Sequence, residues 1–571
     1  MLTNTHYFAM LLNNQVTILS KHCSDFGIEH AVICPGSRSA PLVFAFNRNK
    51  NIKTYAIVDE RSAGYIALGM AQQLQKPVAL ICTSGTATLN FFSAIAEAFY
   101  QKIPLIVLTA DRPSELLNQQ DGQMINQVNV FGSHVRGSLQ FEVRSSEFEV
   151  QSLLEKSILP VKGPVHINVP LVEPLYGDLA EELAIDNGQW AIDNYKKKPF
   201  NNLTIFDNFD KNKLLNAVKS NSKKVILVGQ GFPDQELASV LKSLEQKGFV
   251  ILSDVVSNQY ESSSISHYDL IVAQATPEIL KTLEPDLIIS LGGPVLSKAL
   301  KLWLKKQKPK FHFRIQQDED LVNTYDNVTD YLITDNITPL KFIAEKFISE
   351  NSFLINWQNI NAKAKKLVAD FTQNNQTLFN ELVAVKTVLE QLPNQSQLQI
   401  ANSTAIRYVS YLGLPNKNLT VFCNRGTSGI DGCTSTALGA ALINNKITTL
   451  ITGDLAFFYD RNAFWNNYIP NNLRVILLNN SGGGIFNLID GPSSAPELDK
   501  FFLTKHTLKA KNLAADFGLI YENCTSQNEL NQALNSFFEP SETAKILELS
   551  FDMNKSAEVY KAFRKMKIDH S

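Results

Sequence analysis

The feature that most constrains this chain is a succession of short, nearly continuous apolar runs that end in Gly, Ser, Asp or Asn and alternate with amphipathic helical stretches. The clearest runs are EHAVICPG, KTYAIVD, VALICTSG, PLIVLTAD, KVILVGQG, FVILSD, DLIISLGG, LQIANS, TTLITGD and RVILLNNSGG. Apolar strands separated by helices are typical of parallel sheets that helices cover on both faces. We therefore predict an α/β protein whose polar strand ends share the edge where open sheets bind ligands.

Two weakly patterned stretches divide the 571 residues into three parts. Residues 177–203 mix charge, Asn and Pro, a composition typical of a connecting segment. Residues 350–380 are polar, rich in Asn and Gln and partly helical, and we interpret them as the second connecting segment between domains. The predicted architecture is three doubly wound parallel-sheet domains at residues 1–180, 200–350 and 380–571.

Composition argues against several classes of protein. The chain has 53 basic and 55 acidic side chains and a net charge of -2, so its surface as a whole is no footprint for nucleic acid or an anionic membrane; the basic cluster Lys196, Lys197 and Lys198 fits a solvated linker. No basic segment precedes an apolar core at the N-terminus, and no apolar run reaches the roughly 18 residues of a membrane helix. The six cysteines show no CxxC spacing, which indicates neither disulfides nor zinc. We expect a cytoplasmic protein that binds neither nucleic acid nor membrane.

Two strand ends near the C-terminus combine oxygen-bearing side chains with glycines. Asp454 follows one apolar strand, and Asn480 follows the next, 26 residues later, a gap that suits one helix and a return strand. Carboxylate and amide oxygens suit Mg²⁺, and the glycines at 482–484 leave the backbone free to approach a diphosphate. Helix capping and turn formation account for the same residues about equally well.

This arrangement resembles the metal and diphosphate motif of thiamine diphosphate enzymes, in which Gly-Asp is followed one helix and one strand later by Asn-Asn. The resemblance implies that Asp454, Asn480 and the Gly482 carbonyl bind Mg²⁺ or Mn²⁺. The residues it implies as contacts of thiamine diphosphate are Gly453, Asp454, Leu455, Asn480, Gly482, Gly483, Ile485 and Phe486. Most of that superfamily has Gly where this chain has Leu455.

A thiamine enzyme also needs a carboxylate that hydrogen-bonds the pyrimidine ring and favours the tautomer that deprotonates the thiazolium carbon. The resemblance implies that this catalytic residue is Glu60, in VDERSAGYIALGMAQQL, after an apolar strand and at the start of a helix rich in small residues. A buried Glu is costly unless it has a donor, and a cofactor nitrogen supplies one. The alternative is a first-turn Glu that complements the helix dipole. The metal motif favours the catalytic role.

Seven motifs, in order along the chain, carry a closer resemblance. They are ICPGSRSAPL, TSGTATLN, VLTADRP, GPVHINVPLVEPLY, CNRGTSGIDGCTSTALGAA, GDLAFFYD and NNSGGGIF. Together they resemble the family of 2-succinyl-5-enolpyruvyl-6-hydroxy-3-cyclohexene-1-carboxylate synthases of menaquinone biosynthesis, whose own form of the motif is GDL. The resemblance implies an N-terminal pyrimidine-binding domain, a central Rossmann-like domain and a C-terminal domain for diphosphate and Mg²⁺.

The implied reaction decarboxylates 2-oxoglutarate and adds the succinyl carbanion to the conjugated alkene of isochorismate. Both substrates are dicarboxylates, and Arg pairs with carboxylate at two points. The residues implied near the isochorismate-derived part are Ser37, Arg38, Arg112 and Gln123. Those implied near the 2-oxoglutarate-derived carboxylates are Ser403, Arg407 and Arg425. A structural ion pair explains any one arginine better, but their joint occurrence in matched motifs favours binding.

Other residues are less constrained by the pattern. Ile430 in SGID matches the bulky apolar residue that supports the bent cofactor, with core packing as the alternative. Lys298 in GGPVLSKAL resembles the first member of a basic pair whose second position is Ala299 here, which leaves substrate contact by the central domain open. The chain has no His-His pair near its motifs, and His166, inside an apolar strand, fits a structural role better.

Two alternatives to this function stay open. Another thiamine diphosphate-dependent 2-oxoacid enzyme, such as one like acetolactate synthase, would need a small apolar pocket, whereas this sequence offers arginines. A nucleotide-binding regulator would use VGQGFPD, which follows a strand but lacks the full GxGxxG spacing. Because Glu60 and Asp454 belong to different predicted domains, the cofactor must lie where two domain surfaces meet. In the family those surfaces come from two subunits, which implies a homodimer or homotetramer.

Overall fold

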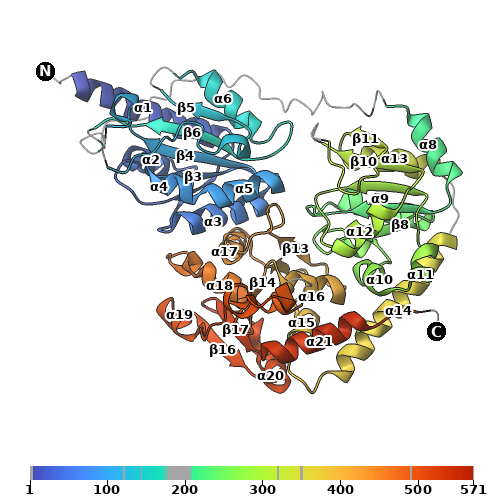
Figure 1. Cartoon of the computed structure of the whole chain (residues 1–571). Helices are drawn as coiled ribbons and strands as arrows, with labels where there is room; N and C mark the ends of the chain where they lie inside the picture. The colour runs from blue at the N-terminus through green and yellow to red at the C-terminus, as the bar shows by residue number, and fades with distance from the viewer. Residues whose placement is uncertain are drawn as a thin grey trace. The chain divides into compact units, whose positions relative to one another are not determined.

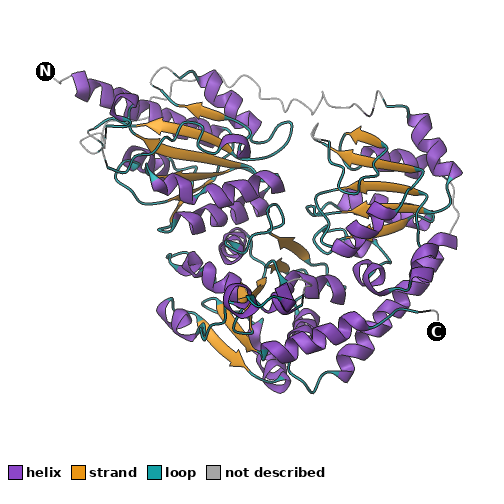
Figure 2. Ribbon diagram, in the orientation of Figure 1, coloured by secondary structure: helices purple, strands orange, loops and turns teal. Residues whose placement is uncertain are grey.

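The structure is a computed structural model that describes residues 4–119, 122–142, 145–173, 175, 206, 209–317, 321–347, 352–488 and 492–569. Among these residues the strands form three parallel sheets, with helices between most successive strands (Figure 1, Figure 2). This confirms the predicted α/β class. The predicted connecting segment at 177–203, with its three lysines, lies outside the described residues.

The first sheet has the strand order β2-β1-β3-β4-β6-β5. Its strands are β1 (His30–Ile33), β2 (Lys53–Ala56), β3 (Val78–Cys82), β4 (Leu105–Asp111), β5 (Ser138–Gln140) and β6 (Val165–Pro170). The helices of this part are α1 (Asn4–Asp25), α2 (Ala40–Arg48), α3 (Glu60–Leu74), α4 (Thr86–Asn90), α5 (Phe92–Gln101) and α6 (Glu147–Lys156). The order reverses between β1 and β3, so the PGSRS and TSG loops that follow them flank the crevice where such sheets bind ligands.

The central sheet has the strand order β11-β10-β9-β7-β8. Its strands are β7 (Lys224–Val228), β8 (Val250–Ser253), β9 (Leu287–Leu291), β10 (Phe311–Gln316) and β11 (Asp330–Ile333). The helices around it are α8 (Lys211–Ser220), α9 (Gln235–Gln246), α10 (Tyr268–Gln274), α11 (Pro277–Thr282), α12 (Lys298–Lys306) and α13 (Thr338–Lys346). The central sheet is thus one of the predicted doubly wound parallel sheets.

The main-chain N–H groups of Gly229 and Gly231, in the turn after β7, bond to protein carbonyls and are therefore not available to a phosphate. The N–H groups of Gly229 and Gly231 donate to the carbonyls of Leu291 and Val256 at 3.0 and 3.2 Å. A Cβ on Gly229 would lie only 1.9 Å from the Gly293 carbonyl oxygen, so the turns after β7 and β9 fill the space between them. A nucleotide needs free N–H groups at such a turn, which argues against the regulator alternative.

The third sheet has the strand order β13-β12-β14-β15-β17-β16. Its strands are β12 (Gln397–Ile400), β13 (Thr420–Cys423), β14 (Thr448–Gly453), β15 (Leu473–Asn479), β16 (Ile520–Cys524) and β17 (Lys545–Ser550). The helices of this part are α14 (Ser352–Asn374), α15 (Glu381–Gln391), α16 (Thr404–Leu412), α17 (Cys433–Ile443), α18 (Asp454–Tyr459), α19 (Lys511–Asp516), α20 (Gln527–Phe537) and α21 (Met553–Lys565). The strand order reverses between β12 and β14, which are followed by Ser403 and Asp454.

Burial explains why the strands are unbroken apolar runs in the sequence. Every residue of β3, β4, β7, β9 and β15 is buried, whereas the edge strands β2 and β16 expose at least half of their residues. A strand covered on both faces has no solvent side that calls for polar residues. Each large apolar side chain buried this way contributes roughly 1.5–3 kcal/mol to folding. Within the described part of the chain, no helix combines the length and hydropathy needed to cross a bilayer.

Packing divides the chain into two compact units. The first unit consists of Met1–Pro199, Asn424–Asn445 and Phe458–Leu473. The second unit consists of Phe200–Cys423, Lys446–Phe457 and Arg474–Ser571. The chain therefore alternates between units in its last third, so that α17 belongs to the first unit and β12, β13 and β14 to the second. The domain boundaries given above remain a prediction.

Within the first unit, α3 and α17 pack with their backbones close together. A Cβ on Gly69 would lie 2.1 Å from the Thr436 carbonyl oxygen, and a Cβ on Gly439 would lie 2.1 Å from the Ile66 carbonyl oxygen. Only glycine permits backbones to approach this closely. Because α3 begins at Glu60 and α17 follows the SGID loop, this crossing fixes the two segments relative to each other.

Candidate active site

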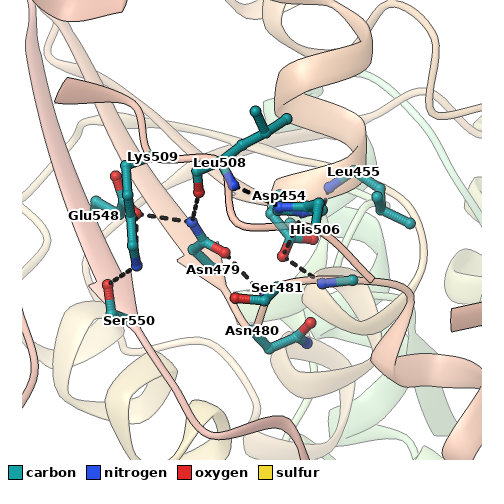
Figure 3. A network of polar contacts seen from close by, with 12 residues as sticks. Asp454, Leu455, Asn479, Asn480, Ser481, His506, Leu508, Lys509, Glu548 and Ser550 are labelled. Carbon is teal, nitrogen blue, oxygen red and sulfur yellow. Dashed lines mark hydrogen bonds and ion pairs between the residues drawn. The ribbon is translucent and has the colours of Figure 1, made fainter. Parts of the chain in front are cut away.

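Asp454, the predicted metal ligand, lies at the junction of β14 and α18 and is 2% exposed. Its carboxylate accepts the main-chain N–H groups of Leu455 at 2.7 Å and of Gly482 at 2.9 Å (Figure 3). Burial raises the pKa of Asp454 to about 6, against the lowering effect of N–H groups from this turn, including those of Asn480 and Ser481. A cation beside this carboxylate would stabilise its charged form.

Asn480 directly follows β15, the neighbour of β14 in the sheet, and is 8% exposed. Its side-chain nitrogen donates to Glu381 Oε1 at 2.5 Å, whereas its Oδ1 is buried and accepts no hydrogen bond from any described residue. A buried acceptor without a donor is costly unless a cation or another donor lies beside it. With the Asp454 carboxylate, this oxygen makes a hard donor set of the kind Mg²⁺ or Mn²⁺ prefers, so the residues present fit the metal.

The turn after Asn480 depends on glycine. The N–H of Gly483 donates to the Leu503 carbonyl at 2.6 Å, and the N–H of Gly484 donates to the Gly482 carbonyl at 3.0 Å. A Cβ on Gly484 would lie 2.7 Å from the side-chain nitrogen of Asn480, so a larger residue would displace that side chain. The other predicted cofactor contacts flank this turn at the end of β14, in α18 and in the 3-10 turn Gly484–Asn487; they are Gly453, Leu455, Ile485 and Phe486.

His506 also contacts the predicted metal ligand and was not expected from the sequence. Its Nε2 lies 3.3 Å from Asp454 Oδ2, and its Nδ1 accepts the Leu508 N–H at 3.1 Å (Figure 3). Because Nδ1 accepts, the neutral ring carries its proton on Nε2, the ring nitrogen that lies near the carboxylate. Burial lowers the pKa of His506, which favours this neutral form.

A buried glutamate holds the segment that carries His506. Glu548 on β17 accepts the side-chain nitrogen of Asn479 and the N–H of Ala510, each at 2.8 Å (Figure 3). Asn479 also donates to the Leu508 carbonyl at 2.9 Å. The first Asn of the Asn-Asn pair therefore fixes the neighbouring segment, while the second is the predicted ligand.

Glu60 is the first residue of α3 and is half-buried. The preceding Asp59 caps the helix by accepting the Ser62 N–H at 2.9 Å, and its other oxygen accepts the Asn462 side-chain nitrogen at 2.7 Å. Burial raises the pKa of Glu60; its own main-chain N–H opposes this shift, and the Asp59 charge adds to it. A carboxyl group shifted toward its neutral form suits one that shares a proton with a ring nitrogen.

Arg112 and Gln123 lie together at the carboxyl edge of the first sheet. Arg112 Nη1 donates to the Gln123 carbonyl at 2.8 Å and to Ser84 Oγ at 3.1 Å. Ser84 Oγ donates to the same carbonyl at 2.9 Å, and Gln123 has a φ of 53°, in the left-handed region. Ser37, in the loop after β1, is exposed. The structure thus joins two of the predicted isochorismate residues directly.

Arg38 is buried and is held by the segment that follows β6. Its guanidinium donates to the Leu171 carbonyl at 3.0 Å and to Glu173 Oε1 at 3.1 Å. Asp111, the last residue of β4, accepts the Arg112 N–H at 2.8 Å. Burial raises the pKa of Asp111, and the guanidinium groups of Arg112 and Arg38 partly oppose this rise. The two arginines therefore share one acidic neighbour.

A buried polar network supports this sheet edge and was missed from the sequence. Asn168 Nδ2 donates to Asp111 Oδ2, and its Oδ1 accepts the Thr109 hydroxyl, both at 2.8 Å. His166 Nε2 lies 2.8 Å from Thr109 Oγ1, and burial lowers the pKa of His166 to about 3. Polar residues at alternate positions of otherwise apolar strands, in β4 and β6, are the signal that could have revealed the network.

Glu97 anchors the loop that carries Arg425 and Ile430. This residue of α5 is 1% exposed; its Oε1 accepts the Gly426 N–H at 2.8 Å, and its Oε2 accepts the N–H and hydroxyl of Thr427, each at 2.6 Å. Ile430 is half-buried. No sequence signal identified Glu97, because the loop it holds lies more than 300 residues away.

Ser403 and Arg407 meet at the start of α16. Ser403 has φ 76° and ψ -127°, a conformation that costs a non-glycine residue about 1–3 kcal/mol and clusters at functional sites. Arg407, one turn later, is exposed and donates to the Ser403 carbonyl at 2.5 Å. The structure brings these two predicted substrate residues together.

Lys298 is exposed at the first residue of α12. The preceding Ser297 donates its hydroxyl to the buried Asp269, and Ser410 of α16 donates to the other oxygen of Asp269 at 2.7 Å. One carboxylate therefore ties the start of α12 to the helix that carries Arg407. Helix α12 beside the central sheet is therefore connected, through Asp269, to the helix that carries the predicted substrate residue Arg407.

The predicted residues fall into two groups, one in each unit. The first unit contains Ser37, Arg38, Glu60, Arg112, Gln123, Arg425 and Ile430. The second contains Lys298, Ser403, Arg407, Gly453, Asp454, Leu455, Asn480, Gly482, Gly483, Ile485 and Phe486. Among the described residues no cluster of three or more His, Cys, Asp or Glu could hold a metal ion by itself. A site built from one carboxylate, one amide and the main chain leaves coordination positions for phosphate and water.

Two family models match the chain. One, described as thiamine pyrophosphate enzyme, N-terminal TPP binding domain, matches residues 14–130. The other, described as middle domain of thiamine pyrophosphate, matches residues 188–400. The chain thus has the N-terminal TPP binding domain predicted from its motifs.

Full-length relatives narrow the assignment. A protein of Cytophaga hutchinsonii named 2-succinyl-5-enolpyruvyl-6-hydroxy-3-cyclohexene-1-carboxylate synthase is 41% identical over 555 residues, which cover 94% of this chain and 96% of the relative. Proteins with the same name from Flavobacterium psychrophilum and Bacteroides fragilis are 39% and 34% identical, over 90% and 96% of this chain and 91% and 97% of theirs. The chain therefore belongs to the family of 2-succinyl-5-enolpyruvyl-6-hydroxy-3-cyclohexene-1-carboxylate synthases, within the thiamine diphosphate-dependent enzymes.

Proposed function

We propose that this chain decarboxylates 2-oxoglutarate and joins the resulting succinyl unit to isochorismate, giving 2-succinyl-5-enolpyruvyl-6-hydroxy-3-cyclohexene-1-carboxylate in menaquinone biosynthesis. The observation that carries the proposal is the unpartnered, buried oxygen of Asn480, a residue whose main-chain N–H contacts the buried Asp454, in a chain with a TPP binding domain and full-length relatives of this name. An oxygen pair of this kind is the anchor that a metal-bound diphosphate needs.

Asp454, Asn480 and the Gly482 carbonyl would hold Mg²⁺ or Mn²⁺, and the glycine turn after them would face the diphosphate. When bound, thiamine diphosphate supplies the nucleophilic carbon and the electron sink that decarboxylation requires. Glu60 holds a proton at the pyrimidine nitrogen, a role that its raised pKa supports. Ile430 supports the cofactor through apolar contact.

The arginines orient the dicarboxylate substrates. Arg38 and Arg112 are both buried, and a guanidinium group is the side-chain group whose planar donors match a carboxylate at two points. We assign them, with Ser37 and Gln123, to isochorismate. The residues assigned to the 2-oxoglutarate-derived carboxylates are Ser403, Arg407 and Arg425, with Lys298 as a further cation from the central domain. In the reaction the bond between the carboxylate carbon and the keto carbon of 2-oxoglutarate breaks and carbon dioxide leaves; the keto carbon then bonds to the alkene carbon of isochorismate, and one proton is taken up by the ring.

We also propose that the enzyme works in the cytoplasm as a homodimer or homotetramer. The predicted N-terminal domain at 1–180 binds the pyrimidine and the predicted C-terminal domain at 380–571 binds the diphosphate, and family resemblance assigns these surfaces to different subunits. Sedimentation equilibrium of the purified protein tests this point. A monomer at micromolar concentration that retains full activity would contradict it.

The function is tested by the loss of isochorismate ultraviolet absorbance, with thiamine diphosphate, Mg²⁺ and 2-oxoglutarate present and each omitted in turn. We expect a decay that requires all three components. Protein that binds the cofactor but leaves isochorismate unchanged would overturn the substrate assignment. Consumption of pyruvate by that protein would then support the enzyme class of acetolactate synthase.

A further inference from the structure

A buried carboxylate without a role in the proposed reaction lies beside the predicted metal ligand. Glu381, the first residue of α15, is 3% exposed. One of its oxygens accepts the side-chain NH₂ group of Asn480, and the other accepts the hydroxyl of the buried Tyr408, both at 2.5 Å. Both partners donate, so the carboxylate acts toward them purely as an acceptor.

Packing alone does not determine which end of the Asn480 side-chain amide, the oxygen or the nitrogen, faces the metal site. Its oxygen and nitrogen ends are almost equal in size and exchange by rotation about one bond, but only the oxygen end binds a cation. The Glu381 carboxylate takes the NH₂ end. The oxygen end is then the atom left buried without a partner, and the main-chain N–H of the same residue lies against the Asp454 carboxylate.

We propose that Glu381 is a positioning residue that selects the metal-binding orientation of the Asn480 amide, and that Tyr408 fixes the carboxylate in turn. This inference rests on the proposed function, because it concerns the same metal site. Tyr408 lies on α16, the helix that also carries Arg407. Orientation of the metal ligand and placement of a predicted substrate residue therefore depend on one helix.

The substitution Glu381→Gln tests the proposal by reversing the hydrogen bond. The buried Tyr408 hydroxyl needs an acceptor, so it takes the oxygen of the new amide, and the NH₂ group of that amide then faces Asn480. Two NH₂ groups cannot bond to each other. Asn480 must rotate, which turns its own NH₂ group toward the metal.

A second substitution distinguishes orientation from stability. Adding Asn480→Asp to Glu381→Gln gives residue 480 an oxygen at both ends. One oxygen accepts from the new amide and the other remains available to the metal, and the net charge of the pair equals that of the native protein. A role in stability alone predicts no rescue of metal binding by this double variant.

The measurement is Mn²⁺ binding to the full chain with saturating thiamine diphosphate, followed by the electron paramagnetic resonance signal of free Mn²⁺. We expect Glu381→Gln to weaken Mn²⁺ binding about 10- to 100-fold, the range for losing a group that orients a metal ligand, and the double variant to return within about threefold of the native protein. The matched control is Asp254→Asn, because Asp254 is a buried carboxylate in the same unit that also accepts a tyrosine hydroxyl, from Tyr268 at 2.9 Å. It should change thermal stability but not Mn²⁺ affinity.

The outcomes separate this inference from the proposed function. Native protein that binds no Mn²⁺ with thiamine diphosphate overturns the proposed function itself. Native binding with an equal affinity in folded Glu381→Gln protein, or a double variant no better than the single one, overturns only the role of Glu381. If Glu381→Gln protein does not fold, Tyr408→Phe replaces it, with an expected weakening of at least about threefold; unchanged affinity there also overturns the inference.

Discussion

At the scale of single residues, burial acts on the acidic side chains of this protein in two ways. Asp460 is fully buried, and both of its oxygens are satisfied, by the N–H and the hydroxyl of Ser435 at 2.7 Å each. Around Asp454 the donors are also present, but the neighbouring Asn480 oxygen is left without one. Complete satisfaction indicates a structural acid, whereas an acid beside an unsatisfied acceptor indicates a place for a ligand.

Glu60→Gln is predicted to abolish most of the synthase activity while leaving the fold intact. The amide keeps the size of the carboxyl group but cannot exchange a proton at the pyrimidine nitrogen, and proton transfer by a positioned group contributes about 10²- to 10⁴-fold. Initial rates of isochorismate loss, together with the melting temperature, give the comparison. A variant with the native rate would remove Glu60 from the mechanism.

Asp460 gives a pH dependence whose sign follows from its environment. Burial raises the pKa of Asp460 from 3.8 to about 7, against the Ser435 hydrogen bonds, so between these values the folded state holds a proton that the unfolded state has released. The contribution of this group to stability is therefore complete below pH 4 and is lost as the pH rises toward 7. Relative to Asp460→Asn, the native protein should lose at most about 1.4 kcal/mol of unfolding free energy per pH unit between pH 5 and 7. Parallel stability profiles of the two proteins would contradict this.

At the scale of elements, the crossing of α3 and α17 sets the positions of Glu60 and Ile430, two of the predicted cofactor residues. Gly439→Ala would place a methyl group only 2.1 Å from the Ile66 carbonyl oxygen, so the two helices must separate. Overpacking of this kind costs about 1–3 kcal/mol, and we expect the melting temperature to fall by several degrees. The control is Gly453→Ala, whose Cβ meets nothing within 4 Å and should leave the melting temperature nearly unchanged.

The sequence predicted the elements better than the contacts between them. Strand ends, the helix beginning at Glu60 and the three sheets follow from hydrophobic runs and turn residues, which are local signals. Glu381 was missed because an acid at the start of a helix is fully explained by the helix dipole, and its partner Asn480 lies 99 residues away. Glu97 was missed because the loop it holds lies more than 300 residues away. Long-range partners of buried acids leave no local pattern, while the assigned site residues themselves stay predictions.

At the scale of the whole molecule, the cofactor and the metal should stabilise the protein only together. A ligand that binds only the folded state adds about 2.7 kcal/mol at a concentration of 100 times its dissociation constant. We expect thiamine diphosphate with Mg²⁺ to raise the melting temperature, and thiamine diphosphate with EDTA to have little effect, because in the proposed site the diphosphate is held through the metal. Equal shifts with and without EDTA would argue against the metal site at Asp454 and Asn480.

The alternation of the last third of the chain between the two units limits how the protein can be divided. A fragment that begins at residue 380 would retain α17 but lack α3, the helix against which the Gly439 backbone packs. The buried face of α17 would be left as exposed surface that includes its apolar residues, and such surface favours aggregation. Truncation at the predicted domain boundaries should therefore give insoluble products. Gene-fusion or domain-exchange experiments therefore need to transfer residues 60–74 together with the C-terminal third, so that α3 and α17 always come from the same parent protein.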